Sequence, residues 1–203
     1  MPKLLTQNSK LKKTSKVVDA KVMNFGIPAF KDPDSGKRTC PFAGDCAKIC
    51  YAQKGAYAWS NVKPAFAWRY QQTKLDSFVD DMVEAIVKNK VDYLRVHDSG
   101  DYYSPEYIDK WMTIANRLPD VKFYSYTKSI PLFIVKDLPE NYDIIFSEGS
   151  TVDHMIDPER HRHARIFQSY DELHQAGYAD AMSSDLMATK WFNETNKVGL
   201  VIH

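Results

Sequence analysis

Short β-rich runs alternate with helical runs along most of this chain, and this alternation constrains its fold more than any other feature. We expect strands at residues 21–27, 93–96, 122–126, 142–146 and 197–203. The helical runs between them are 61–72, 76–89 and a run that begins with Ser104 and Pro105. Strands that alternate with helices form βαβ units, which predict a mostly parallel sheet.

We predict an α/β fold of about six such units. Because a closed (β/α)8 barrel needs more, the expected architecture is a partial (β/α)6 TIM-like open barrel, in which ligands gather at the carboxyl ends of the strands. Residues 19–203 are expected to form this single domain, with weaker candidate strands at 165–168 and 178–182. Residues 1–18 are rich in lysine and poor in large apolar groups, so we expect a flexible basic N-terminal tail there.

The composition is that of an ordinary globular protein, with 44% apolar and 26% charged residues in a chain of 203. The formal net charge of +1 gives no global field toward nucleic acid, which is therefore not an expected partner. No stretch approaches the roughly 20 apolar residues of a membrane span, so no membrane is expected either. We predict a cytoplasmic protein, in a compartment that keeps thiols reduced.

The three cysteines, Cys40, Cys46 and Cys50, fall within eleven residues of a loop at 38–57 that follows the first expected strand. An odd number of closely spaced cysteines does not suit a disulfide framework. Soft thiolates select iron–sulfur clusters, zinc or copper(I). Three thiolates on one short loop suit a 4Fe–4S cluster whose fourth iron stays open, and a 3Fe–4S form would use the same ligands. We therefore predict that these cysteines bind an iron–sulfur cluster.

Two other interpretations of the cysteines stay open. A structural zinc site usually has four protein ligands, so a histidine would have to join the three cysteines. Inert cysteines without a metal are the remaining alternative, although three in one short loop would be an unusual coincidence. The histidines at 154, 161 and 163 lie in a charged run, for which we expect a solvated loop.

Polar residues follow three successive expected strands, and we expect them at the edge of the sheet that carries the cysteine loop. They are His97, Asp98, Ser99, Gly100 and Asp101 after the second strand, Ser125 and Lys128 at the third, and Ser147 and Glu148 at the fourth. Gly100 would let the backbone approach a ligand closely. The alternatives are an Asx-turn after the second strand, a structural His97, a solvated Lys128 and a plain turn at Glu148.

Three features together resemble the phage family known as gene product 88. They are the opening at residues 4–7, the cysteine loop at 40–57, and the pair of strand-end segments at 95–103 and 123–129. All of them occur in this order within residues 1–150. The resemblance implies a phage-encoded protein that works in the cytoplasm of a bacterial host, and it implies no particular activity.

A looser resemblance is to the radical S-adenosylmethionine superfamily, whose partial (β/α)6 barrel carries three cysteines in a loop after the first strand. The spacing here is C-x5-C-x3-C, whereas C-x3-C-x2-C is usual in that superfamily, so the resemblance is in kind. It implies that Asp98, Ser99 and Asp101 hold the methionine amine. The other expected cofactor-binding residues are Lys128 for the carboxylate, Ser147 or Glu148 for the ribose, and the neighbouring His97, Gly100 and Ser125.

The expected function is that of a phage iron–sulfur protein, with reductive cleavage of S-adenosylmethionine as the activity that the second resemblance implies. Whether the chain is an enzyme stays open, because two alternatives use the same cysteines. One is an iron–sulfur electron-transfer or scaffold protein without S-adenosylmethionine chemistry, and the other is a zinc-stabilised binding protein. The expected partner is a small-molecule ligand at the open iron or a redox partner.

Overall fold

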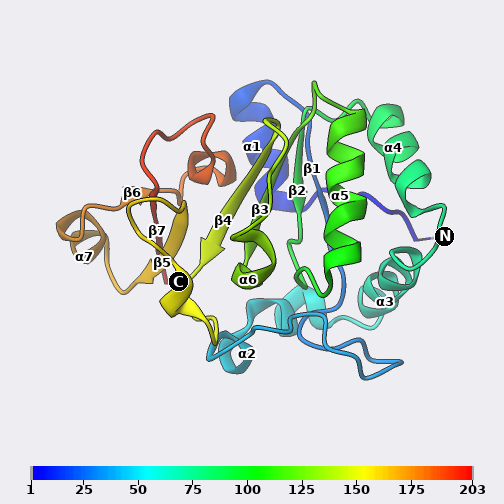
Figure 1. Cartoon of the computed structure of the whole chain (residues 1–203), viewed down its shortest axis with the longest axis horizontal. Helices are drawn as coiled ribbons and strands as arrows, with labels where there is room; N and C mark the ends of the chain where they lie inside the picture. Colours follow the sequence, from blue (N-terminus) through cyan, green and yellow to red (C-terminus); the bar gives the residue numbers. More distant parts are fainter. Residues whose placement is uncertain (1, 203) are drawn as a thin grey trace.

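A computed structural model of the chain, which describes residues 2–202, contains a seven-stranded sheet (Figure 1). The strands lie in the order β1-β2-β3-β4-β5-β7-β6, and every neighbouring pair is parallel. Their bounds are β1 Val22–Phe25, β2 Tyr93–Val96, β3 Lys122–Thr127, β4 Tyr142–Ser147, β5 His163–Phe167, β6 Ala179–Asp180 and β7 Lys197–Val201. The parallel sheet confirms the predicted α/β class.

Helices connect most of these strands. The α-helices are α1 Ser9–Val18, α2 Cys46–Ile49, α3 Lys63–Gln72, α4 Phe78–Lys88, α5 Pro105–Arg117, α6 Ile130–Phe133 and α7 Tyr170–Gln175. Short 3-10 turns are η1 Tyr51–Gln53, η2 Gly55–Ala58, η3 Asp153–Met155 and η4 Asp185–Ala188. Helix α5 begins where the sequence predicts, because Pro105 is its first residue and the Ser104 side chain accepts the N–H of Tyr107.

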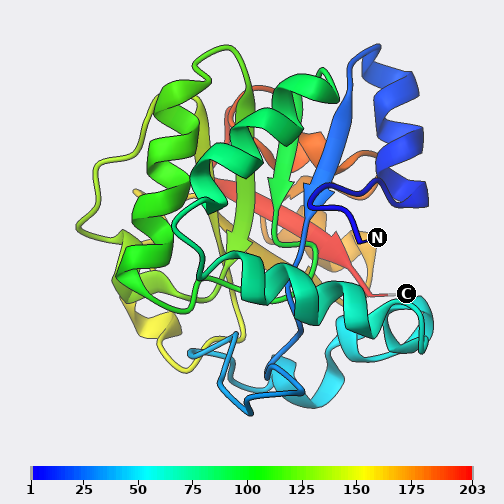
Figure 2. The same cartoon turned by 90° about the vertical axis from the view of Figure 1, so that its right-hand side faces the viewer.

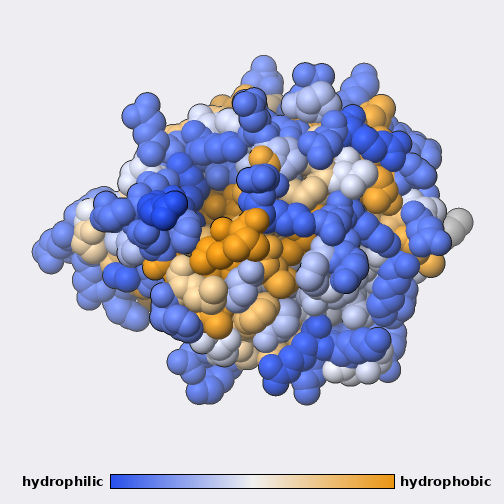
Figure 3. Space-filling view, viewed as in Figure 1, coloured by the Kyte–Doolittle hydropathy of each residue, from blue (hydrophilic) through white to orange (hydrophobic). Residues whose placement is uncertain are grey.

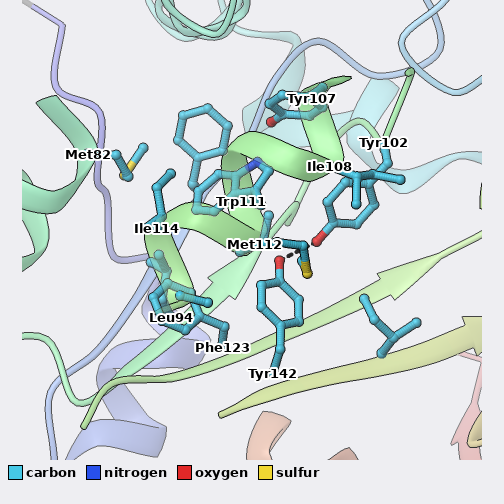
Figure 4. Close-up of a cluster of buried hydrophobic side chains, with 14 of the residues drawn as sticks. Met82, Leu94, Tyr102, Tyr107, Ile108, Trp111, Met112, Ile114, Phe123 and Tyr142 are labelled. Atoms are coloured by element: carbon cyan, nitrogen blue, oxygen red, sulfur yellow. Dashed lines mark hydrogen bonds between the residues drawn. The ribbon is translucent and has the colours of Figure 1, made fainter. Parts of the chain in front are cut away.

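One face of the sheet is apolar and is covered by α4 and α5 (Figure 2). Leu94 and Val96 of β2 point to this face and pack with Trp111 of α5 in the main hydrophobic core. Figure 4 shows the same core, where the hydroxyls of Tyr102 and Tyr142 hydrogen-bond to each other. Burial of these large side chains is the main source of stability for this half of the fold.

The opposite face of the sheet is covered by α1 and η4 (Figure 2). Leu11 of α1 and Leu186 of η4 pack there against Tyr124 of β3. Since successive residues of a strand point to opposite faces, Arg95 points to this side and meets Asp185. The second face therefore combines a smaller apolar cluster with a buried ion pair.

The order of the strands departs in one respect from a simple run of βα units. β1 to β5 are neighbours in the order in which they occur along the chain, but β7 lies between β5 and β6. The sheet has seven strands where we expected about six units. β1 and β6 each pair with one neighbour, so the sheet is open at both edges.

The N-terminal residues differ from the flexible tail that we expected at 1–18. The Asn8 side chain accepts the N–H of Leu11 and begins α1, and Leu11 is fully buried. Thr6 pairs antiparallel with Asn24 of β1. The many lysines hide this helix in the sequence, because Leu11 and Thr14 are the only residues of α1 that are buried. Met1 lies outside the described residues.

The C-terminal third also contains two differences. β5 begins at His163, which is buried and bonds the Tyr178 hydroxyl at 2.8 Å, so the expectation of a solvated loop was wrong for this histidine. The last strand ends at Val201, and His203, which we expected in it, lies outside the described residues. Within residues 2–202, no helix has both the length and the apolar character needed to cross a membrane.

Candidate functional site

The cysteine loop follows β1 and covers the carboxyl edge of the sheet, at the lower end of the molecule in Figure 1. Its first half is fastened to the segment after β4. The N–H of Gly44 donates to the carbonyl of Gly149 at 3.2 Å, and the N–H of Thr151 donates to the carbonyl of Phe42 at 3.0 Å. A Cβ at Gly44 would lie 2.8 Å from the Gly149 oxygen, so this close approach requires glycine.

Cys40 is hydrogen-bonded to the backbone of the segment that follows β1. Its Sγ accepts a hydrogen bond from the N–H of Phe30 at 3.3 Å. Burial raises the pKa of the Cys40 thiol to about 12, and the negative charges of Asp101, Cys50 and Cys46 act in the same direction.

Cys46 lies where the cysteine loop meets the ends of β3 and β4. A Cβ at Gly149 would be 3.9 Å from the Cys46 Cβ and 3.9 Å from the Lys128 Nζ. Burial raises the pKa of Cys46, and the Lys128 ammonium acts in the opposite direction. All three cysteines are partly buried free thiols. The loop thus brings thiols and a lysine to one region of the sheet edge.

Three of the histidines are engaged in hydrogen bonds within the protein. Within residues 2–202, no three histidine, cysteine, aspartate or glutamate side chains, the three cysteines included, are arranged to hold a metal ion. His97 bonds the Tyr107 hydroxyl through Nε2 at 2.9 Å, and His163 bonds Tyr178 in the same way. The N–H of Asp157 donates to Nδ1 of His161 at 3.0 Å.

Asp101 ties the carboxyl ends of β2 and β3 together. Its carboxylate accepts the Thr127 hydroxyl at 2.6 Å, the N–H of Lys128 at 2.8 Å and the N–H of Tyr102 at 2.7 Å. Burial raises the pKa of Asp101, although these hydrogen bonds act in the opposite direction. Both carboxylate oxygens are used within the protein, so Asp101 acts as a structural link at the strand ends.

Lys128 connects the ends of β3 and β4 in a similar way. Its Nζ donates to the Ser147 hydroxyl at 2.7 Å, to the Ser147 carbonyl at 3.1 Å and to the Glu148 carbonyl at 2.8 Å. An ammonium has three donors, and all three are used here. Lys128 therefore places a charge beside Cys46 without presenting a free donor to a ligand.

Three more of the expected site residues bond within the protein. The Ser125 hydroxyl donates to the backbone carbonyl at the end of β2 at 2.6 Å. Glu148 accepts the Arg165 guanidinium at 2.7 Å. His97 is buried, and burial lowers its pKa to about 3, so its ring is neutral and structural. These contacts favour the structural alternative for His97, and they engage Ser125 and Glu148 within the protein.

At Gly100, the segment that follows β2 packs closely against the segment that follows β1. It has a φ of +79°, and a Cβ there would lie 2.3 Å from Cγ1 of Ile27. The N–H of Ile27 donates to the carbonyl of Ser99 at 3.0 Å. Only glycine fits both the backbone angle and the space, so Gly100 serves this crossing of two backbone segments.

Asp98 differs from Asp101, because part of its carboxylate has no partner. Oδ2 accepts the Tyr57 hydroxyl at 3.1 Å, and the Asp98 carbonyl accepts the Tyr51 hydroxyl at 2.7 Å. Oδ1 is buried without a hydrogen bond among the described residues. Burial raises the pKa of Asp98, against the effects of Arg95 and of the hydrogen bonds. This oxygen packs against the backbone at Gly26, and the Asn24 side chain acts with the Tyr57 hydroxyl to lower the pKa of Asp98.

A cavity of about 230 Å³ lies beside these groups, between the cysteine loop and α3. Its lining residues are Pro28, Ala29, Lys31, Pro33, Ala52, Gln53, Tyr57, Lys63, Phe66 and Ser99. Of the expected ligand-binding residues, only Ser99 lines it. A Cβ at Gly26 would lie 2.1 Å from Asp98 Oδ1 and 2.8 Å from the Phe66 ring, which places the carboxylate directly behind the cavity wall.

Sequence reasoning missed the role of Tyr51 and Tyr57. Both hydroxyls hold Asp98, and the two rings contact each other edge to face at 5.7 Å. Their position within the cysteine loop was the available signal. Nothing in the sequence indicated the Arg95–Asp185 ion pair, because its members lie 90 residues apart.

Comparison with known proteins gives one family. The family model described as "Gene product 88" matches residues 2–200. The chain is 28% identical over 141 residues to the Gene 88 protein of Mycobacterium phage D29, covering 56% of this chain and 58% of that one. It is 30% identical over 102 residues to the Gene 88 protein of Mycobacterium phage L5, covering 44% and 43%. The matches thus span about half the length of these relatives, and no solved structure matches the chain.

Proposed function

The chain belongs to the gene product 88 family, and we propose that it is a phage iron–sulfur protein whose cluster is bound by Cys40, Cys46 and Cys50. The observation that carries the proposal is the placement of all three thiols on one short loop. That loop is fastened to the carboxyl edge of a parallel sheet, where α/β proteins bind their ligands. When bound, such a cluster stores and transfers single electrons.

The donor chemistry of the loop suits a cluster better than a single ion. A single zinc ion needs four ligands around one point, whereas a cube distributes three cysteines over three iron atoms. The N–H of Phe30 already donates to Cys40, and hydrogen bonds to cluster sulfurs are one of the ways in which proteins set cluster potentials. The Lys128 charge beside Cys46 offsets part of the negative charge of three thiolates.

We propose further that the sheet is a partial barrel of the radical S-adenosylmethionine type. The support is the neighbouring order of β1 to β5 and the position of the cysteine loop directly after β1. The place of β7 between β5 and β6 departs from a regular barrel. The likeness is therefore limited to the part of the sheet that carries the candidate site.

Electron transfer or a scaffold role is the function that this geometry supports best. Asp101, Lys128 and Ser147, which the resemblance assigns to S-adenosylmethionine, are bonded to one another or to backbone. S-adenosylmethionine cleavage is the second candidate. Asp98 favours it, because Oδ1 lacks a partner and lies behind a cavity that Ser99 lines.

The test is to purify the protein without oxygen and to measure iron, acid-labile sulfide and zinc. We expect a brown protein with iron and sulfide in equal amounts. Cys46→Ala should lose most of the iron, because two thiolates hold a cluster poorly. Ser60→Ala, an exposed turn residue of the same segment, is the control and should keep its iron. A colourless, zinc-loaded protein, or full iron in Cys46→Ala, would overturn the proposal.

The second candidate function has its own readout. The reduced protein is mixed with S-adenosylmethionine, and its electron paramagnetic resonance spectrum and the formation of 5′-deoxyadenosine are recorded. A changed spectrum that is lost in Asp98→Asn supports the second candidate. An unchanged spectrum without 5′-deoxyadenosine leaves electron transfer or scaffolding as the function.

A further inference from the structure

The surface around the cysteine loop is basic. Residues 31–63 contain six basic and three acidic residues, a net charge of +3, whereas the whole chain carries +1. The basic residues are all exposed and are Lys31, Lys37, Arg38, Lys48, Lys54 and Lys63. We call this surface the basic face. It lies at the lower end of the molecule, where Figure 3 shows hydrophilic residues along the rim and apolar residues above them on the left.

Most of these cations have no acidic partner. In the described part of the chain, Lys48 is the one member of the basic face with an ion pair, to Asp45 at 2.9 Å. Asp32 is buried and accepts the N–H and the hydroxyl of Ser35. Five cations therefore face solvent around the cysteine loop, where the exposed acids are Asp34 and the Asp45 that pairs with Lys48.

Acidic residues on the neighbouring strand ends do not neutralise the basic face either. Glu148 pairs with Arg165 at 2.7 Å. Asp153 accepts the N–H groups of Gly149 and Ser150 at 2.7 and 2.9 Å. The field of the unpaired cations thus extends from the loop into solvent, which steers acidic molecules toward it.

An exposed aromatic ring lies within the basic face, directly after Cys50. Tyr51 is 58% exposed, yet its hydroxyl is held by the Asp98 carbonyl at 2.7 Å. Trp59 of the same segment is 61% exposed. Tyrosine and tryptophan are common anchors of protein interfaces, and a ring with a fixed hydroxyl loses little freedom on binding.

We infer that the basic face docks a small acidic electron-carrier protein, which delivers electrons to the cluster on the cysteine loop. This inference rests on the proposed function. One electron passes per encounter, so the carrier is oxidised by one electron and the cluster is reduced by one. The sequence pI of about 7.7 favours an acidic protein over nucleic acid as the partner, because nucleic-acid-binding domains usually have a pI above about 9.

Binding is tested with fluorescently labelled flavodoxin, an acidic carrier, as the probe. We expect binding that weakens as salt rises, and Lys37→Glu and Lys54→Glu each to weaken it by about threefold or more at low salt. Lys88→Glu is the control. Lys88 is also exposed, but it ends α4 before β2 begins, at the opposite edge of the sheet, and its reversal should leave binding unchanged.

Equal effects of all three reversals, or no binding of flavodoxin at low salt, would overturn the inference. A labelled single-stranded oligonucleotide is compared with flavodoxin at the same salt. If the oligonucleotide binds more tightly, and if Lys37→Glu and Lys54→Glu lose this binding, the inference is overturned in favour of nucleic acid. The binding assay does not need a loaded cluster, so its outcome is separate from the iron and sulfide analysis.

Electron delivery is measured on the iron-loaded protein. We expect reduced flavodoxin to reduce Lys54→Glu at least about threefold more slowly than the wild type at low salt, with the difference disappearing at high salt. Dithionite, a small reductant, should reduce both proteins at the same rate. Equal rates with flavodoxin would reject the docking site while the cluster itself stands, and a protein without iron would reject the proposed function.

Discussion

Asp185 provides the sharpest test of how the fold is held together. It is 2% exposed. Both of its carboxylate oxygens accept hydrogen bonds from Nη1 of Arg95, each at 3.1 Å, and Oδ2 also accepts the Tyr124 hydroxyl at 2.8 Å. The Lys10 Nζ lies 3.2 Å away. One carboxylate in η4 thus connects α1, β2 and β3 on the second face of the sheet.

Asp185→Asn keeps the size of the side chain and removes its charge. The change leaves Arg95 largely buried without its counter-ion, and removing one partner of a buried pair costs about 3–5 kcal/mol. Total stabilities of domains are about 5–15 kcal/mol, so the variant should lose a large fraction of its free energy of unfolding.

The assay is equilibrium unfolding in urea at neutral pH, followed by circular dichroism. Asp80→Asn is the matched control, because the Asp80–Arg117 pair is solvent-exposed and should contribute about 1 kcal/mol or less. If both variants lose the same free energy, or if Asp185→Asn loses under about 1 kcal/mol, the argument that the buried pair holds the second face is refuted.

The same pair predicts a pH dependence. Burial alone would raise the pKa of Asp185, but Arg95, Lys10 and the Tyr124 hydroxyl outweigh it and lower the pKa. A lowered folded-state pKa gives stability that is present above the unfolded value of about 3.9 and is lost as the pH falls through the folded value. The difference between wild type and Asp185→Asn should therefore shrink in acid.

Two further predictions concern the strand ends. Gly100→Ala should lose about 2–5 kcal/mol of the free energy of unfolding in urea, because the new methyl group overlaps Ile27 and the backbone angle is strained. Gly177→Ala is the control and should lose only about 1–2 kcal/mol, because Gly177 has a similar φ of +73° but lies in open space. Equal losses would contradict the overlap with Ile27. Burial lowers the pKa of His97 in the folded protein to about 3, whereas a histidine of the unfolded chain has a pKa of about 6.5. Between about pH 6.5 and about pH 3 only the unfolded chain binds a proton at His97, so the free energy of unfolding falls as the pH drops through that window. Relative to His97→Asn, the wild type should lose about 1.4 kcal/mol per pH unit there, and parallel pH profiles would show that His97 is not neutral.

The sequence predicted the parts of the fold that local patterns determine. Ser104 and Pro105 mark the start of α5 because a cap and a proline act within one turn, and β2 has the predicted bounds. Helix α1 was missed because only Leu11 and Thr14 of its ten residues are buried, which is too few for a visible pattern. The place of β7 depends on pairing between distant segments, which no local pattern encodes.

The candidate site shows the same division. The common sheet edge of the polar residues followed from the parallel arrangement, and Asp101, Lys128 and Ser147 do meet there. Their roles could not be predicted, because a buried carboxylate and a buried ammonium bond whatever donors and acceptors tertiary packing brings to them. Asp98 shows the opposite outcome, since one of its carboxylate oxygens and Nδ1 of the neighbouring His97 are buried without a hydrogen bond among the described residues.

The place of β7 in the sheet has a consequence for the order of assembly. During synthesis, β1 to β5 leave the ribosome in the order in which they pair, so each strand finds its neighbour already present. β6 emerges before β7 but pairs only with β7 among the described strands, so it has to wait. A released chain truncated before residue 197 should therefore protect β1 to β5 from proteolysis and leave residues 179–180 open to it.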